Sequence, residues 1–536
     1  MNREKVSENI YLFGLLLLVA AMPLSVFMMS VSQIILAVSW LISGNIIDKT
    51  KTAFRNPVVA VLTTIYFMHL VGGFYSTDFN YYFNDIRVKI PLLVLPVIIY
   101  SSPKISEQWF NRIIAVFVFA VLASTLISMG VLYDILPHKN PIYEARNISI
   151  FISHIRLSLF ICIAVFATVF YLIKNQHTNS FIKDVFLILL ISWFIIFLFI
   201  LEAMTGFIIL VFIAILLFLN FVLGKKGTSF KIAAITLILS IPFFTFIYIR
   251  NEAARIFPEH RIDISALDKK TPNGNLYHHS LDAPLPELPY LNPRMQENGT
   301  PLVLYVCAEE MERAWNNRSS LNYNGKDLRG QELKYTLARF LSSKGFRKDS
   351  TAVYNLSESE INAIENGIPN VEYQNKISFK NRVDKIIMEY YSHKYGENPS
   401  GKSILQRIEF WKAGWNIFTA NFIVGVGTGD VRKAFDAEYQ RMNSMLAESS
   451  RLRAHNQYLT FALTFGIFGL LFFLFSLLYP IIKLKKMNDY FYMIFILIAA
   501  LSMLTEDTLE TQAGVTFFAF FNSFLLFALK NSPDDR

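Results

Sequence analysis

Blocks of about 20 apolar residues, separated by short polar stretches, recur along most of this chain. A helix of about that length covers the hydrocarbon core of a bilayer. The pattern therefore predicts an all-α polytopic membrane protein with about 12 transmembrane helices. We place these helices at residues 10–29, 31–47, 58–75, 89–100, 113–133, 155–173, 185–201, 206–223, 232–249, 458–478, 490–504 and 515–529. The fourth is short and contains Pro91 and Pro96, an interruption that is tolerated where a helix lines a cavity or packs inside protein.

A polar stretch of about 200 residues separates the ninth apolar block from the tenth. Its apolar residues predict a short strand at 301–307 and helices at 309–315, 331–341, 377–391 and 404–418. Ser357 followed by Glu360 is a capping-box pattern, which predicts the start of a further helix. We therefore expect a folded, mostly helical insert. The chain divides into helices one to nine at 1–250, a loop domain at 251–454 and the last three helices at 455–536.

The last helix expected in the insert carries an apolar stripe, formed by Leu405, Ile408, Trp411, Trp415 and Phe418 at helical spacing. Such a stripe predicts core packing rather than a ligand site. The alternative is that Trp411 and Trp415 rest at the membrane surface, where tryptophan is enriched.

Composition supports the membrane interpretation. Hydrophobic residues make up 53% of the chain and charged residues 17%, whereas soluble domains have about 45–50% apolar and about 25% charged residues. A soluble globule is therefore excluded.

The net charge of +9 does not indicate nucleic-acid binding, because of where the charges lie. Residues 251–454 hold 27 Lys+Arg and 25 Asp+Glu, which leaves 50 − 27 = 23 basic against 41 − 25 = 16 acidic residues for the apolar part. The excess is concentrated in alternate short loops. Cytoplasmic loops of membrane proteins are rich in Lys and Arg, so we expect both termini in the cytoplasm and the insert outside it.

Common catalytic and cofactor motifs are not found. The glycine-rich segment 425–430 has neither the Lys-Ser/Thr of a phosphate-binding loop nor a strand before it, so we interpret it as a tight turn. No metal-ligand constellation is present, and the sequence predicts no metal and no cofactor.

Cationic residues instead gather at the expected outer ends of several helices. His455 lies where the insert enters the tenth apolar block, and histidine exchanges a proton near neutral pH. The cations are Arg87, Lys89, Arg156, Arg407, Arg451 and Arg453. Taken singly, each has an ordinary interpretation as a side chain that reaches the lipid headgroups. Together, on one side of a membrane around one histidine, they suit a lipid-linked diphosphate.

The segment 407–471 resembles the C-terminal signature of the O-antigen ligase/polymerase superfamily. The similarity lies in Arg407-x-x-x-Trp411, Gly425-Val-Gly-Thr-Gly, His455-Asn-x-Tyr-Leu and Gly466-Ile-Phe-Gly-Leu, in this order and spacing. The acidic run at 505–510, Lys89-Ile-Pro and the segment around Arg156 are also similar to that family. One departure is Ala203-Met204, since many relatives carry Ser-Arg there.

The resemblance implies a GT-C-like glycosyltransferase of the bacterial inner (cytoplasmic) membrane, with its large loop in the periplasm. It implies a glycan donor on undecaprenyl diphosphate and, for an O-antigen ligase, a hydroxyl of lipid A-core as acceptor. His455 would be the catalytic base. Arg156, Arg407 and Lys89, with Arg87, Arg451 and Arg453 behind them, would bind the diphosphate without a metal, and the anomeric centre would be inverted.

Three other functions stay open at this point. An O-antigen polymerase and a protein O-oligosaccharyltransferase share the same motifs and chemistry. A transporter of lipid-linked glycans would also bind diphosphates. However, the apolar segments lack the midplane charges that transporters usually carry.

Overall fold

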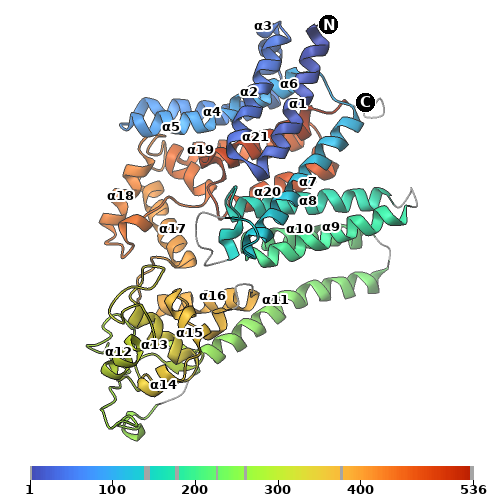
Figure 1. The fold of residues 1–536 in the computed structure, drawn as a ribbon. Coiled ribbons are helices and arrows are strands. Elements are labelled where there is room, and N and C mark those ends of the chain that lie inside the picture. Colours follow the sequence, from blue (N-terminus) through green and yellow to red (C-terminus); the bar gives the residue numbers. More distant parts are fainter. Residues whose placement is uncertain are drawn as a thin grey trace. The chain divides into compact units, whose positions relative to one another are not determined.

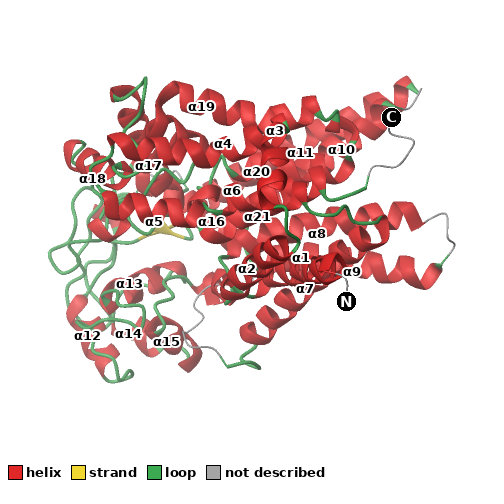
Figure 2. Cartoon of the chain, turned by 90° about the horizontal axis from the view of Figure 1, so that it is seen from above, coloured by secondary structure: helices red, strands yellow, loops and turns green. Residues whose placement is uncertain are grey.

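The computed structural model describes residues 3–137, 145–175, 180–224, 227–258, 262–374 and 378–530, and it is mostly helical (Figures 1 and 2). The chain forms two compact units. The first, here called the helical unit, comprises Met1–Leu217 and Gln406–Arg536. The second, the insert unit, is Phe218–Leu405. Residues 406–454 therefore belong to the unit that holds most of the apolar helices, although the sequence pattern groups them with the loop domain.

The helical unit contains the following helices: α1 (Arg3–Leu24), α2 (Val26–Ile42), α3 (Ile46–Arg55), α4 (Pro57–Gly72), α5 (Phe79–Lys89), α6 (Pro91–Ser101), α7 (Glu107–Leu132), α8 (His154–Asn175), α9 (Phe181–Ile200), most of α10 (Met204–Leu223) and of α17 (Ser403–Ala420), α18 (Val431–Arg441), α19 (Gln457–Lys483), α20 (Tyr490–Ser502) and α21 (Gln512–Phe527). Short 3₁₀ turns lie at Gly73–Tyr75, Ala145–Ile148, Glu448–Ser450, Lys486–Asn488 and Thr508–Glu510.

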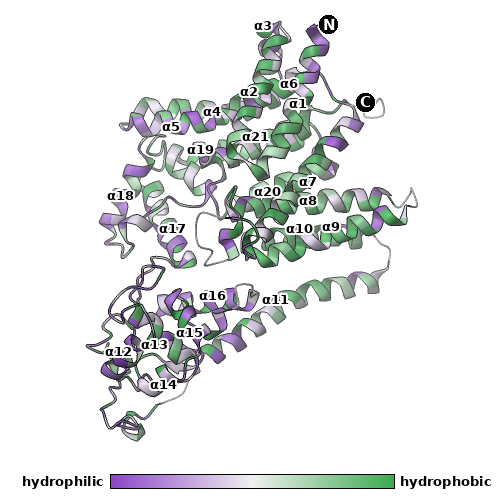
Figure 3. Cartoon of the chain, in the orientation of Figure 1, coloured by the Kyte–Doolittle hydropathy of each residue, from purple (hydrophilic) through white to green (hydrophobic). Residues whose placement is uncertain are grey.

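Polar residues begin several of these helices, as helix capping requires. The Asn56 side chain accepts hydrogen bonds from two backbone N–H groups of α4, and Pro57 follows it at the first helical position. Asn456 caps α19 through the N–H of Leu459, and Asp489 caps α20. The helices α9, α10 and α11 consist mostly of apolar residues and have strongly hydrophobic surfaces (Figure 3).

Eight described helices are long and apolar enough to cross a membrane: α1, α4 with its following turn, α7, α8, α9, α10, α11 and α19. A ninth candidate is α2 with α3, a pair bent by 111°. The helices α20 and α21 are apolar but shorter, at 13 and 16 residues. This arrangement is consistent with an all-α polytopic membrane protein, and the number of twelve spans stays a prediction. The turn expected at residue 30 lies instead at Ser25, where α1 ends and α2 begins.

The core of the helical unit is built around α21, which is buried along nearly its whole length. Phe521 packs edge-on against Phe117 of α7 and in parallel with Phe495 of α20. Phe517 contacts Phe160 of α8. Elsewhere α1 packs on α2 and α7, and α8 lies beside α9 (Figure 1). The aromatic side chains thus hold α7, α8 and α20 around one central helix.

The helix α19 is broken at Gly466, whose φ of 67° lies outside the helical region. The segment after α17 fills the break: the N–H of Ile467 donates to the carbonyl of Phe422, and the N–H of Val426 to that of Leu463. A Cβ at position 466 would lie 2.1 Å from the Ile423 carbonyl oxygen, so only glycine fits. Backbone groups freed by the break are therefore satisfied by a neighbouring segment.

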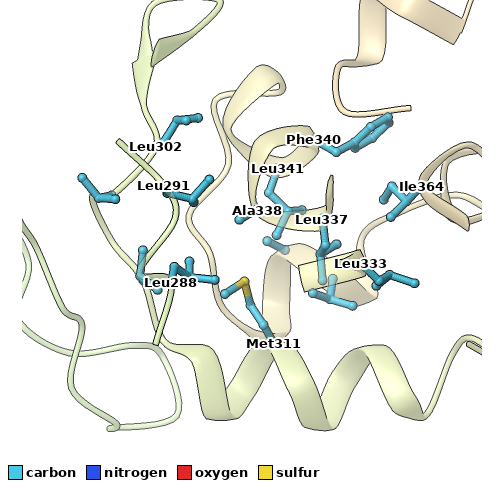
Figure 4. Close-up of a cluster of buried hydrophobic side chains, with 14 of the residues drawn as sticks. Leu288, Leu291, Leu302, Met311, Leu333, Leu337, Ala338, Phe340, Leu341 and Ile364 are labelled. Carbon is cyan, nitrogen blue, oxygen red and sulfur yellow. The ribbon is translucent and has the colours of Figure 1, made fainter. Parts of the chain in front are cut away.

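The insert unit contains α11 (Thr228–Ile256), α12 (Ala308–Asn316), α13 (Leu333–Ser343), α14 (Ser350–Tyr354), α15 (Glu358–Glu365), α16 (Phe379–Lys394) and 3₁₀ turns at Ile264–Ala266 and Val371–Gln374. Two short strands, β1 (Gln296–Glu297) and β2 (Thr300–Pro301), pair antiparallel. Its core gathers Leu288, Leu291 and Met311 against one face of α13 (Figure 4). Trp315 of α12 is also fully buried there.

The helices predicted in the insert are confirmed as α12, α13, α15 and α16, and Ser357 and Glu360 form the expected capping box. Residue 377, at the start of one predicted helix, lies outside the described residues. The strand predicted at 301–307 is wrong: only Pro301 is in a strand, and the residues after it form turns, apart from two isolated bridges of Val306, to His278 and to Lys348. The apolar side chains of this segment are buried in the core, so their hydrophobicity reflects packing rather than strand pairing.

The expected core stripe of α17 is wrong for its central positions. Trp415 is 58% exposed, and Trp411 and Ile408 are also exposed, whereas Leu405 and Phe418 are buried. The helix α17 buries a different face, with Phe410, Ala413 and Ile417, against α18 and α19.

Candidate functional site

A cavity of about 530 Å³ lies within the helical unit. Its walls come from α5, α8, α18, the segment before α19 and the loop between α20 and α21. The residues that line it are Tyr81, Asn84, Asp85, Val88, Arg156, Arg432, Phe435, Asp436, Arg451, Leu452, Arg453, His455, Glu506, Asp507, Glu510 and Thr511.

His455 is held by a backbone turn that Asp507 fixes. Its φ of 46° is left-handed, a conformation that costs a non-glycine residue about 1–3 kcal/mol unless its surroundings impose it. Asp507 Oδ2 accepts the N–H of His455 at 3.0 Å, and Oδ1 accepts the N–H of Asn456 at 3.1 Å and the Thr460 hydroxyl at 2.7 Å. The strained turn is thus stabilised by a buried carboxyl group.

The imidazole of His455 lies between an aromatic ring and a carboxylate. It stacks on Phe410 of α17, with ring centroids 5.6 Å apart and an interplanar angle of 28°. Its Nδ1 lies 3.8 Å from Glu506 Oε2, too far for a hydrogen bond but within ion-pair range. Phe410 therefore fixes the ring plane, and Nδ1 faces a carboxylate.

Glu510 connects three elements. Its Oε2 accepts Lys89 Nζ of α5 and Arg453 Nη1, both at 2.8 Å, and its Oε1 accepts Gln457 Nε2 at 3.1 Å. Arg453 Nη1 also donates to the Tyr81 hydroxyl at 2.9 Å. This arrangement fixes one edge of the Arg453 guanidinium at the wall of the cavity.

Two further arginines reach the site from other helices. Arg407 Nη2 of α17 donates to Glu506 Oε1 at 2.8 Å. Arg156, at the start of α8, donates to the Thr508 carbonyl at 3.4 Å. Gly514 makes room for it, because a Cβ there would lie 2.1 Å from Arg156 Nη1.

The electrostatics of the loop after α20 follow from these contacts. Burial raises the pKa of Glu506, but His455, Arg407 and Arg156 outweigh burial and hold that pKa below its usual value. Burial would also raise the pKa of Glu510, yet Lys89 and Arg453 bring it well below the usual value. For Asp507, burial prevails and its pKa is raised despite Arg453.

The inner cations are already matched by carboxyl groups. Lys89 and Arg453 contact Glu510, and Arg407 contacts Glu506. The outer wall differs, since Arg432 of α18 is exposed and Arg451 uses its Nε to donate to the Leu446 carbonyl. Within the described ranges, no three His, Cys, Asp or Glu side chains are arranged to hold a metal ion.

The structure brings most of the residues singled out in the sequence to this cavity. Arg156, Arg451, Arg453 and His455 line it. Arg407 does not line the cavity itself, but it donates a hydrogen bond to Glu506, which does.

Two of the residues singled out in the sequence, Lys89 and Arg87, do not line the cavity. Lys89 has no exposed surface and lies behind Glu510, also 2.5 Å from Asp85. Arg87 is exposed, donates to Asn84 and does not line the cavity.

Sequence reasoning missed the carboxyl side of the site. Glu506, Asp507 and Glu510 stood out as an acidic run similar to that of the superfamily, but no role in the site was predicted for any of them. Tyr81 and Arg432 gave no signal, because neither belongs to a recognisable pattern.

The glycine-rich segment is a turn between α17 and α18, as expected. Gly425 and Gly427 have φ of 72° and 85°. Asp430, which follows, accepts the N–H groups of Thr77 and Asp78 and so ties α18 to the start of α5.

Comparison with known proteins gives one match. Residues 364–474 match a family model described as O-antigen ligase, so the matched segment has 474 − 364 + 1 = 111 of the 536 residues. It includes α17, α18, His455 and the first part of α19. No curated protein matches the chain.

Proposed function

Since residues 364–474 place this chain in the O-antigen ligase superfamily, we propose that it transfers a glycan from undecaprenyl diphosphate to a hydroxyl of lipid A-core. The observation that carries the proposal is the convergence of His455 and several arginines on one cavity inside the family's own segment and its neighbours. Such a cavity suits a reaction whose leaving group is an anion.

The mechanism follows from the side chains of the cavity. A hydroxyl is a weak nucleophile, and a base that removes its proton as the anomeric bond breaks accelerates the reaction by about 10²–10⁴. His455 is that base, with Phe410 fixing its ring. Attack from the face opposite the diphosphate inverts the anomeric carbon.

Charge on the departing diphosphate is stabilised by fixed cations. Arg156 and Arg453 line the cavity beside His455. Arg407 lies next to the cavity, where it contacts the lining residue Glu506. Guanidinium groups bind phosphate oxygens in a bidentate manner, which suits a diphosphate better than single ammonium groups do. Lys89 does not contact the donor in this mechanism but holds Glu510, and Arg87 has no part in it.

Charge distribution supports an orientation. Lys483 is the last residue of α19, and Lys485 and Lys486 follow it. His455 precedes the helix, so it lies at the end opposite these basic residues. With the basic end in the cytoplasm, the cavity opens on the periplasmic side of the inner membrane, and the ends of the chain are cytoplasmic. Residues 1–2 and 531–536 are outside the described structure.

The test is transfer by the purified protein in lipid nanodiscs, with a lipid-linked glycan and lipid A-core, followed by gel mobility of the product. His455→Ala should lower the rate by at least about 100-fold. His393→Ala, which removes an exposed histidine of α16, is the matched control. Retained activity of His455→Ala in folded protein would remove the base from the mechanism.

Acceptor choice is tested in a deletion strain. Unmodified core with accumulated lipid-linked polymer indicates a ligase. Chains of a single repeat indicate a polymerase, and loss of glycoproteins indicates a protein O-oligosaccharyltransferase.

A further inference from the structure

The three carboxyl groups of the loop after α20 are held to different degrees. Asp507 accepts three hydrogen bonds, from two backbone N–H groups and a hydroxyl. Glu510 also accepts three, from Lys89, Arg453 and Gln457. Glu506 has one among the described residues, from Arg407 Nη2. Its carboxylate is therefore the one that moves at the lowest cost.

Arg407 is a further guanidinium next to the cavity, and Glu506 occupies it in this structure. Lys89 is fully buried and pairs with Glu510. Arg453 Nη1 already donates hydrogen bonds to Glu510 and Tyr81. The Arg407–Glu506 contact is partly exposed, with 26% and 12% of the two side chains accessible. An incoming diphosphate carries more charge than one carboxylate and matches the guanidinium fork, so it can displace Glu506 from Arg407.

The displaced carboxylate has a second partner close by. Glu506 Oε2 lies 3.8 Å from His455 Nδ1, and a shift of about 1 Å brings the two atoms to hydrogen-bond distance. A carboxylate on Nδ1–H fixes the tautomer in which Nε2 is the free base, and it stabilises the imidazolium that forms when Nε2 takes a proton.

We propose that Glu506 is a positioning residue that exchanges Arg407 for His455 when the donor diphosphate binds. This inference rests on the proposed function. In the transfer step, the acceptor oxygen forms a bond to the anomeric carbon and its proton passes to His455 Nε2. The bond from the anomeric carbon to the diphosphate breaks, and the leaving group departs with the electron pair. The base is thus prepared only in a site that holds its donor.

The exchange predicts opposite effects on donor binding and on turnover. Glu506→Gln keeps the shape of the side chain and removes its charge. Arg407 is then no longer held by an ion pair, so the donor KM should stay equal or fall by up to about fivefold. The kcat should fall about 10- to 100-fold, because His455 loses its charged partner. A residue with only a structural role would not separate the two constants in this way.

Two further variants complete the experiment. Arg407→Gln should raise the donor KM and also lower kcat, because both the bound and the departing diphosphate lose a guanidinium. The rise in KM distinguishes it from Glu506→Gln. Glu107→Gln is the matched control, since Glu107 also pairs with a cation at 2.7 Å but on the exposed surface, and it should leave both constants unchanged.

The outcomes separate this inference from the function on which it rests. If the wild-type protein transfers no glycan, both are wrong. If it transfers glycan and His455→Ala is inactive, but Glu506→Gln keeps the wild-type kcat or raises the donor KM, the exchange alone is wrong. Loss of folded protein in both Glu506→Gln and Glu506→Asp would show that Glu506 supports the fold and would also overturn it.

Discussion

Replacing Lys89 by Met removes the most deeply buried cation of the site and tests whether the ion network around Glu510 stabilises the fold. Lys89 has no exposed surface, and its Nζ lies 2.5 Å from Asp85 Oδ1 and 2.8 Å from Glu510 Oε2. Methionine keeps nearly the same length without the charge. The variant therefore leaves two buried carboxylates with fewer partners.

The magnitude follows from what each carboxylate retains. Glu510 keeps Arg453, whereas Asp85 keeps only the contact of its Oδ2 with His69 Nδ1 at 3.3 Å among the described residues. Removing one partner of a buried ion pair costs about 3–5 kcal/mol, because an uncompensated charge stays buried. We expect Lys89→Met to lower the free energy of unfolding by that amount. The double variant Lys89→Met/Asp85→Asn should recover about half of the loss, since it removes the less compensated carboxylate.

The assay is equilibrium unfolding of the purified protein in mixed micelles of increasing SDS content. Lys174→Met is the matched control, because its ion pair with Glu107 is also short, at 2.7 Å, but both side chains are more than half exposed. Exposed pairs contribute about 0–1 kcal/mol. A change below about 1 kcal/mol for Lys89→Met, equal to that of the control, would refute the reasoning that this buried network is stabilising.

Three other predictions follow from single contacts. Gly514→Ala should raise the donor KM at least about tenfold, because the new Cβ would lie 1.9 Å from the Thr508 carbonyl oxygen and 2.1 Å from Arg156 Nη1 and would displace both the carbonyl and the guanidinium that it binds; an unchanged KM in the transfer assay would exclude a role for Arg156 in donor binding. Trp315→Ala should destabilise the insert unit by about 3–5 kcal/mol, against less than about 1 kcal/mol for exposed Trp411→Ala in the helical unit; equal SDS-unfolding midpoints would contradict this. Burial raises the pKa of Glu310, but hydrogen bonds from Ser350, Thr271 and Asn275 outweigh it and lower the pKa to about 2. The ionised form thus contributes about 3 kcal/mol above pH 5, which is lost as the pH falls toward 2; Glu310→Gln should flatten this acid dependence in melting curves, and an equally steep curve would contradict it.

Hydropathy predicted the long apolar helices well, because a span such as α7 is defined by its own residues alone. The same reasoning failed for α17, where helical spacing identified an apolar stripe but not the face that α18 and α19 cover. It also failed at 301–307, because a buried turn and a buried strand have the same apolar composition. In both cases the deciding contacts come from other parts of the chain.

In the site, too, features set by the local sequence were predicted and features set by distant contacts were missed. The sequence identified the cations near His455, because charge beside an apolar block is visible locally. It predicted that Lys89 binds a diphosphate and gave no indication of Glu510 as its partner, since Glu510 lies 421 positions further along the chain. It also missed Asp507, whose importance lies in accepting the backbone N–H groups of the His455 turn.

The pair of Lys89 and Glu510 has a consequence for how the chain is made. Lys89 is synthesised 421 residues before its carboxylate, so a ribosome that has delivered the first six helices leaves this ammonium group with only Asp85 beside it. The partner arrives with the loop before the last helix. The cavity around His455 is therefore completed only late in synthesis. A truncated product that lacks its final 30 residues contains His455 but not Asp507, Glu510 and Thr511, which line the cavity beside it.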